Sequence, residues 1–301
     1  MNLQVPMDGL IEGSLVALGA AGVTLTYGTL RFGHFAHGEL VSVGAYIALL
    51  VGGVVATAMP ALRVTWGGAT ATPALAFGLL AGALGAGALA LVLDALVYRR
   101  LRERGATMTV AMASFGVSMA LRALLEACFS ARPRYYSEEL SIAIDFGFAR
   151  LAPDRLVVLV LVALVFAALG LYTTRTRMGR EMRAVGENPL LAQVVGIDVA
   201  RVVRATWWLG GAVAGVAGVG LGLLVQIRPS MGAALLLPMF AAAIVGGLGS
   251  LRGALWGGLL VGGGEALAVA WVGAEWRAAV SFALLVLVLI VRPYGLFGRA
   301  T

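Results

Sequence analysis

Both histidines of the chain lie in one short segment, Gly33-His34-Phe35-Ala36-His37-Gly38-Glu39. Two imidazoles and a carboxylate so close together could bind a metal ion or move protons. A metal site is the weaker interpretation, because no obvious further ligand is found elsewhere in the sequence. The flanking glycines instead favour bent or unwound backbone, which membrane proteins tolerate where it lines a water-filled cavity. We therefore expect the segment to line a substrate path or, alternatively, to form an interfacial turn whose histidines cap helix ends.

Five ionisable side chains fall inside strongly apolar stretches: Glu12, Asp94, Arg122, Glu126 and Glu265. Charges buried in lipid are expensive, so such residues are functional candidates. Arg122 and Glu126 are spaced i,i+4 and are expected to neutralise each other on one helix. Asp94 can reach the arginines that follow it, whereas Glu12 and Glu265 have no such neighbour. The candidate residues of a translocation path are therefore His34, Phe35, His37, Glu39, Glu12 and Glu265.

The composition places all these residues in a membrane protein. The chain is 60% hydrophobic and 12% charged, against about 45–50% and 25% for soluble domains. We expect a single transmembrane domain over residues 1–301, all α-helical and polytopic, with about eight or nine spanning helices of about 20 residues each. Two apolar stretches, 232–248 and 276–291, are short and predict tilted, re-entrant or broken helices. The full set of apolar stretches is 9–30, 39–57, 73–98, 106–126, 152–172, 205–227, 232–248, 253–273 and 276–291.

The charge pattern excludes several chemistries. The net charge is +7, and every basic side chain is an arginine. Without lysine there can be no P-loop lysine and no Schiff base, so any ATP that drives the protein binds to another chain. The arginines gather at span ends, as membrane topology requires, and do not indicate nucleic acid. They place the N-terminus outside and the C-terminus inside. The first span lacks a signal peptide's basic region and is expected to be retained.

The longest basic loop, 173–204, has the pattern of a short amphipathic helix. Residues 181–185 predict a helical turn, after which Asn188 can cap a new helix and Pro189 fits its first position. Gly196 is a typical helix stop, and Asp198 can cap the following span. Between them, an apolar stripe has helical spacing: Leu190, Leu191, Val194 and Val195. The helix is expected to lie in the headgroups or to insert into a partner protein.

Several of these segments together resemble one known family. Phe35-Ala36-His37-Gly38-Glu39, followed by Gly44-Ala45-Tyr46, is similar to the Asn-Phe-Ala-His-Gly-Glu…Gly-Ala-Tyr signature of branched-chain amino-acid ABC transporter permeases of the LivH type. The loop 179–185, with Asn188-Pro189 and Gly196-Ile197, resembles the family's coupling loop. Residues 246–254 and 292–298 resemble its last two signatures. His34 replaces the signature's asparagine, and Glu12 charges a first span that is typically uncharged, so both residues could alter the pocket.

The resemblance implies the membrane subunit of an ATP-driven importer in the bacterial inner membrane. Its partners would be a second related permease, two ATP-binding subunits and a periplasmic substrate-binding protein. ATP and Mg²⁺ would bind on the partner ATPase subunits, and this chain would bind no cofactor. The cargo would be branched-chain or other amino acids, with urea, short-chain amides and small organic acids as alternatives. The residues implied in coupling are Arg183, Gly186, Glu187, Asn188, Pro189, Leu190, Gly196 and Ile197.

Two other functional classes remain open at the level of sequence. A self-sufficient proton-coupled carrier or channel would suit the two histidines and the intramembrane carboxylates. Such a carrier does not need a coupling loop, however, and the sequence shows no inverted repeat. A membrane-embedded enzyme would need a nucleophile–base pair or metal site, for which the His/His/Glu segment is the only and weak candidate. The transport subunit is the favoured interpretation.

Overall fold

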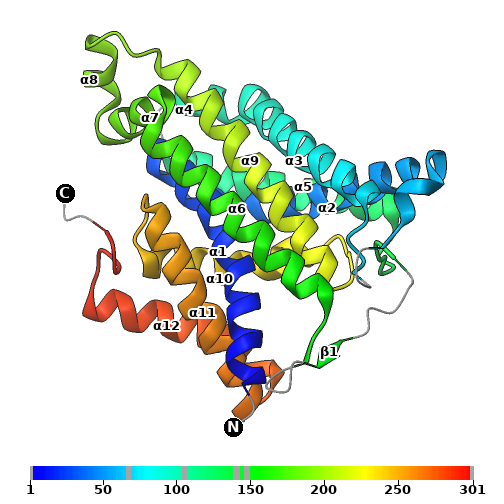
Figure 1. Cartoon of the computed structure of the whole chain (residues 1–301). Helices are drawn as coiled ribbons and strands as arrows, with labels where there is room; N and C mark the ends of the chain where they lie inside the picture. Colours follow the sequence, from blue (N-terminus) through cyan, green and yellow to red (C-terminus); the bar gives the residue numbers. More distant parts are fainter. Residues whose placement is uncertain (1–2, 66–68, 104–106, 138–142, 146–149, 299–301) are drawn as a thin grey trace.

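The computed structural model describes residues 3–65, 69–103, 107–137, 143–145 and 150–298, which form a helical bundle (Figure 1). Eight of the described helices are long and apolar enough to cross a membrane, and α10 is apolar but shorter. The expected all-α polytopic fold is thus confirmed, including the short helix near 232–248. The helices are α1 (Gln4–Leu30), α2 (His37–Ala58), α3 (Pro73–Leu93), α4 (Arg99–Glu103), α5 (Thr107–Phe129), α6 (Pro153–Arg175), α7 (Arg177–Glu187), α8 (Pro189–Val194), α9 (Val199–Leu224), α10 (Met231–Gly246), α11 (Leu251–Trp271) and α12 (Arg277–Val291).

Short elements join these helices. A π-helical turn, η2 (Asp94–Tyr98), continues α3 into α4, and two 3₁₀ turns, η1 (Pro60–Arg63) and η3 (Ala274–Trp276), precede α3 and α12. The strands β1 (Ile144–Asp145) and β2 (Arg150–Leu151) pair antiparallel, with Ile144 opposite Leu151. They lie toward the end of the bundle where the chain begins, whereas α7 and α8 lie at the other end (Figure 1). We call the latter the α7 end.

Glycine lets the central helices approach closely. α1 and α9 are the most buried spans, and α1 packs along α11. A Cβ atom added to Gly13 would lie 2.9 Å from the backbone of Leu259, and one added to Gly218 would overlap the carbonyl of Val41. Close backbone contact of this kind is how helices associate in lipid, where water provides no hydrophobic driving force. Glycines such as Gly13 and Gly218 are therefore packing residues of the core.

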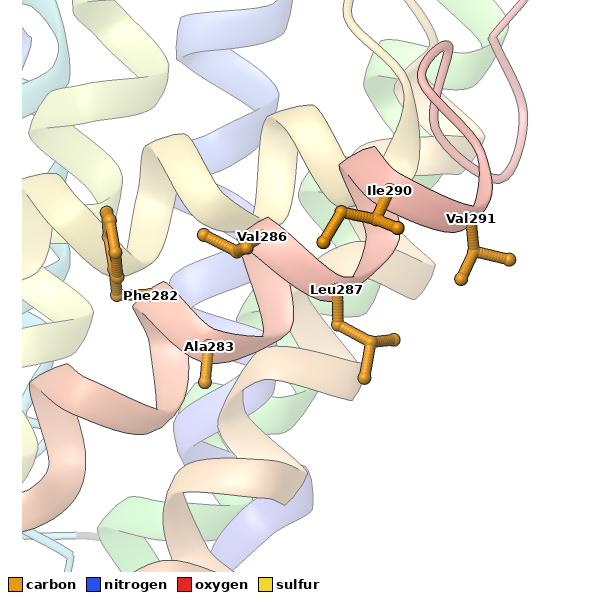
Figure 2. A pocket seen from close by; sticks show the side chains of 6 residues that line it. All are labelled: Phe282, Ala283, Val286, Leu287, Ile290 and Val291. Carbon is orange, nitrogen blue, oxygen red and sulfur yellow. The ribbon is translucent and has the colours of Figure 1, made fainter.

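The outermost helices carry apolar side chains on their outer surface. α12 is the least buried span, and Figure 2 shows six of its side chains around a shallow groove of about 410 Å³. The lining residues are Phe282, Ala283, Val286, Leu287, Ile290 and Val291. A helix that is apolar all round suits a membrane span, so this surface fits a lipid environment.

The backbone between α1 and α2 turns back into the bundle. Arg31 ends α1 in the left-handed conformation, with φ of 57°, and residues 32–36 are not helical. Phe32, His34 and Ala36 are nevertheless buried. α2 begins at His37. The ring of His37 packs against Gly22, in the second half of α1. The bent backbone predicted from the flanking glycines is therefore present, and it carries the histidines into the core.

Candidate functional site

The two histidines belong to a buried aromatic cluster. The rings of Tyr98 and Trp207 are stacked with centroids 4.9 Å apart, and the ring of His34 stands edge-on at 4.8 Å from Trp207. The centroid of His37 is 6.0 Å from that of His34, and Phe32 completes the cluster. All five side chains are buried, so the histidine rings pack inside the bundle. Neither histidine caps α2, whose N-terminus has no side-chain cap.

The ring nitrogens of the two histidines lack hydrogen-bond partners among the described residues. Within the described residues, neither ring nitrogen of His34 has a hydrogen-bond partner. Burial lowers the pKa of His34, which lies between the two spanning helices, well below its ordinary value, and the neighbouring His37 lowers it further. This environment therefore favours the neutral form of His34. The carbonyl of Gly19 lies near His37, but without the geometry of a full hydrogen bond.

Glu39 is bound by α5 and not by the histidines. The Nη2 and Nε groups of Arg122 donate to Oε1 of Glu39 at 2.7 and 3.2 Å, and the Ser118 hydroxyl donates to the same oxygen at 3.4 Å. The expected Arg122–Glu126 pair is thus wrong: the arginine's ion pair is with another helix. Arg side chains lean toward the N-terminus of their helix, which directs Arg122 away from Glu126 and toward α2. No group of three potential metal ligands is present among the described residues.

A ladder of polar side chains on α5 holds the whole segment. One turn before Ser118, the Ser114 hydroxyl accepts a hydrogen bond from the backbone N–H of Phe35 at 3.1 Å. Ser114, Ser118 and Arg122 are each four residues apart, and the two serines are buried. Our sequence reasoning missed this ladder. Its signal was the i,i+4,i+8 spacing of polar residues in an apolar helix, which places them on one face.

Phe35 is the member of the segment that reaches the surface. Its side chain is 37% exposed and lies between Phe240 of α10 and Phe115 of α5, with ring centroids 5.5 and 6.4 Å away. The segment therefore presents two sides. His34 and His37 face the core, whereas Phe35 faces the open surface beside α5.

Glu12 and Glu265 lie in a different place. Glu12 pairs with Arg277 at 3.1 Å, and Glu265 is buried and accepts a hydrogen bond from Ser281. Both partners belong to α12, so the two carboxylates join α12 to α1 and α11. The six candidates thus separate into the segment 34–39 and this helix contact. Asp94 forms the expected ion pair with an arginine that follows it: Nη2 of Arg102 lies 2.6 Å from Oδ1 of Asp94.

The basic loop forms two helices at the α7 end. α7 extends over eleven residues, where the sequence predicted only a turn. Nε and Nη2 of Arg31 donate to the carbonyl of Gly186 at 3.0 and 2.7 Å, and Arg183 donates to the carbonyl of Thr173. A Cβ at Gly186 would overlap the carbonyl of Gly28 in α1. α7 is therefore fixed directly to the residues that precede the buried segment.

α8 has the predicted caps and an exposed apolar surface. Asn188 Oδ1 accepts from the N–H of Leu191 at 3.0 Å, Pro189 takes the first helical position, and Gly196 stops the helix with φ of 84°. Asp198 caps α9 as predicted. Leu190 is 75% and Val194 83% exposed. Glu187 is also exposed, whereas Ile197 packs between α8 and α9. The apolar stripe therefore points away from the bundle.

Comparison with known proteins agrees with this architecture. The family described as "Branched-chain amino acid transport system / permease component" matches residues 5–289. The permease protein LivH of Salmonella typhimurium, from a high-affinity branched-chain amino acid transport system, is 32% identical over 303 residues, which cover 99% of this chain and 96% of LivH. BraD of Pseudomonas aeruginosa, with the corresponding description, is 31% identical over 307 residues, covering 99% and 96%. A probable LivH of Methanocaldococcus jannaschii is 30% identical over 313 residues, covering 96% and 90%.

No solved structure matches the chain. The match of the family covers nearly all of the described helices, and the relatives align over almost their whole length. The chain therefore belongs to the branched-chain amino acid transport system permease family.

Proposed function

We propose that this chain is the membrane-spanning permease subunit of an ATP-driven ABC importer that carries branched-chain amino acids across the bacterial inner membrane. Eight spanning helices and the family membership support a multi-pass transport subunit. The subunit itself is not an enzyme in this proposal. ATP and Mg²⁺ bind on two partner ATPase subunits, a second related permease completes the pathway, and a periplasmic binding protein delivers the substrate.

The observation that carries the proposal is α8. A six-residue helix with caps at its start and a glycine stop at its end presents leucine and valine side chains to the outside at the arginine-rich α7 end. Apolar side chains exposed in one cluster mark an interaction surface. A rigid helix joined through α7 to α1 suits the transfer of force from an ATPase, so α8 is assigned as the coupling helix and the α7 end as cytoplasmic.

The test is a paired replacement of Asn188 and Pro189 by alanine. Loss of an N-cap costs about 1 kcal/mol. Because α8 has six residues and little packing, this loss should unfold it. The tagged chain is purified from its native host in mild detergent, and its co-purifying proteins and its ATP-dependent leucine uptake in proteoliposomes are measured. We expect the wild type to retain ATPase subunits and the variant to lose them together with uptake.

The matched control is Gln193→Ala, which alters the same helix but keeps its cap and its apolar stripe. This variant should behave as the wild type. Full recovery of ATPase subunits by the Asn188/Pro189 variant would contradict the coupling assignment. Recovery of the wild-type chain alone, with ATP-independent uptake, would instead favour a self-sufficient carrier. ATP-driven uptake of urea, an amide or an organic acid in place of leucine would contradict the assigned cargo only.

A further inference from the structure

Arg122 is an unusually placed charge. Its partner Glu39 is buried, but the Arg122 side chain is 38% exposed. A guanidinium has five N–H donors. Nε and Nη2 of Arg122 donate to Glu39, and Nη1 has no acceptor among the described residues. The ion pair therefore has a buried side, closed by Ser118 and α2, and an open side with free donors.

The position of Arg122 along α5 excludes a simple lipid-facing role. Arg122 lies seven residues before the end of α5 at Phe129, about 10 Å along the helix axis. An arginine that faces lipid extends toward the nearer membrane surface. The guanidinium of Arg122 instead extends toward the middle of α5, where it binds the carboxylate of Glu39. Ser118, one turn nearer the middle of the helix, donates to the same carboxylate. Because a charge facing hydrocarbon at this depth is costly, this side of α5 borders protein or water.

The side chains beside Arg122 are large and flexible. They recur with alternating spacings of four and three residues, which places them on one face of α5: Met108, Met112, Phe115, Met119, Arg122 and Glu126. Met119, one turn before Arg122, is 61% exposed, and Phe115 touches Phe35 of the bent segment. Thioethers adapt to apolar groups of varied shape. The cationic group of Arg122 thus lies next to an apolar surface, formed by Met119 and Phe115, that can adapt its shape.

We infer that Arg122 binds the carboxylate of the transported amino acid, while Met119 and Phe115 contact its aliphatic side chain. This inference rests on the proposed function. A guanidinium matches a carboxylate through parallel N–H···O bonds. Glu39 neutralises Arg122, so a zwitterion adds no net charge to the site, which is favourable where water is scarce. Arg122 thereby selects for the carboxylate, and the methionine surface accepts more than one aliphatic side chain.

The experiment uses protection of an engineered cysteine in the purified complex, reconstituted in proteoliposomes. The single native cysteine, Cys128, is exposed and is first replaced by serine. Met119→Cys then reports on the inferred site, and Leu124→Cys is the matched control. Leu124 is also exposed but lies about 200° around the helix from Arg122. Labelling by a membrane-impermeant maleimide is followed with leucine or with leucinamide, which lacks the carboxylate.

We expect Met119→Cys to react and Leu124→Cys to stay unlabelled. Leucine should slow the labelling of Met119→Cys at least fivefold, and leucinamide should not. Addition of Arg122→Gln should raise the leucine concentration needed for protection about tenfold or more, because charge-assisted hydrogen bonds are lost. Arg122→Lys should restore part of the protection, and Glu126→Gln should leave it unchanged.

Three outcomes would overturn the inference. They are an unreactive Met119→Cys, labelling that leucine does not slow, and equal protection by leucine and leucinamide. Retention of leucine protection in a fully assembled Arg122→Gln complex would also overturn it. Failure of the proposed function is distinguishable, because the wild-type complex would then show no ATP-dependent leucine uptake before any cysteine is introduced.

Discussion

Replacement of Gly186 by alanine should detach α7 from α1 and destabilise the protein. The added Cβ atom would overlap the carbonyl of Gly28, a backbone atom that cannot rotate away. Relief requires the two helices to separate. Separation also weakens the two hydrogen bonds, at 3.0 and 2.7 Å, from Arg31 to the carbonyl of Gly186.

The magnitude follows from three contributions. Overpacking costs about 1–3 kcal/mol, and loss of charged hydrogen bonds costs about 1.5–3 kcal/mol. Alanine returns about 1 kcal/mol through its higher helix propensity. The free energy of unfolding should therefore fall by roughly 1.5–5 kcal/mol, which corresponds to several degrees in Tm.

The measurement is the thermal unfolding of the purified complex, followed by size-exclusion chromatography of a fluorescent fusion after heating. Gly170→Ala in α6 is the matched control, because an added Cβ meets nothing within 4 Å there. We expect this control to melt at or slightly above the wild-type temperature. Equal melting of the Gly186 and Gly170 variants would refute the close contact between α7 and α1.

Three further substitutions probe the buried segment and its partner on α5. His37→Ala should alter the rate of leucine uptake while the complex still assembles, because the ring fills the space between α1 and α2 beside Gly22; unchanged uptake kinetics would restrict His37 to a packing role. Glu39→Gln and Arg122→Gln should each lower stability by about 2 kcal/mol, because each leaves an uncompensated polar or charged partner, whereas the double variant should recover part of the loss. Melting curves of the four proteins give the coupling energy, and strictly additive effects would rule out the pair.

Local patterns in the sequence predicted the helices and their caps well. Asn188, Pro189, Gly196 and Asp198 act within a few residues of themselves, so their roles can be predicted without knowledge of the fold. The same holds for Asp94 and the arginine eight residues later. Apolar stretches of spanning length likewise define the helices, because lipid requires the backbone to satisfy its own hydrogen bonds.

Pairing between distant helices could not be predicted in the same way. Arg122 has a carboxylate four residues away, and the local rule favours that pair. The packing of α2 against α5 instead brings Glu39 close, and the buried carboxylate needs a partner more than the exposed Glu126 does. Similarly, Glu12 meets Arg277 only because the fold brings the start of α12 within side-chain reach of α1. Contacts of this kind depend on helix order in three dimensions.

The bent segment links the proposed coupling helix α8 to the α5 surface that is inferred to bind the substrate. At one end, Arg31 is fixed to α7 through Gly186, and α7 continues into the exposed helix α8. At the other end, Phe35 and Glu39 are fixed to Ser114 and Arg122 of α5. Residues 32–36 are not helical, and the segment contributes to α2 through the carbonyls of His34 and Ala36, which accept from the N–H groups of His37 and Leu40. A change in its backbone angles therefore disturbs few helical hydrogen bonds. We therefore expect a shift of α7 under an ATPase to change the α5 face first, while the glycine-packed core of α1, α9 and α11 stays in place.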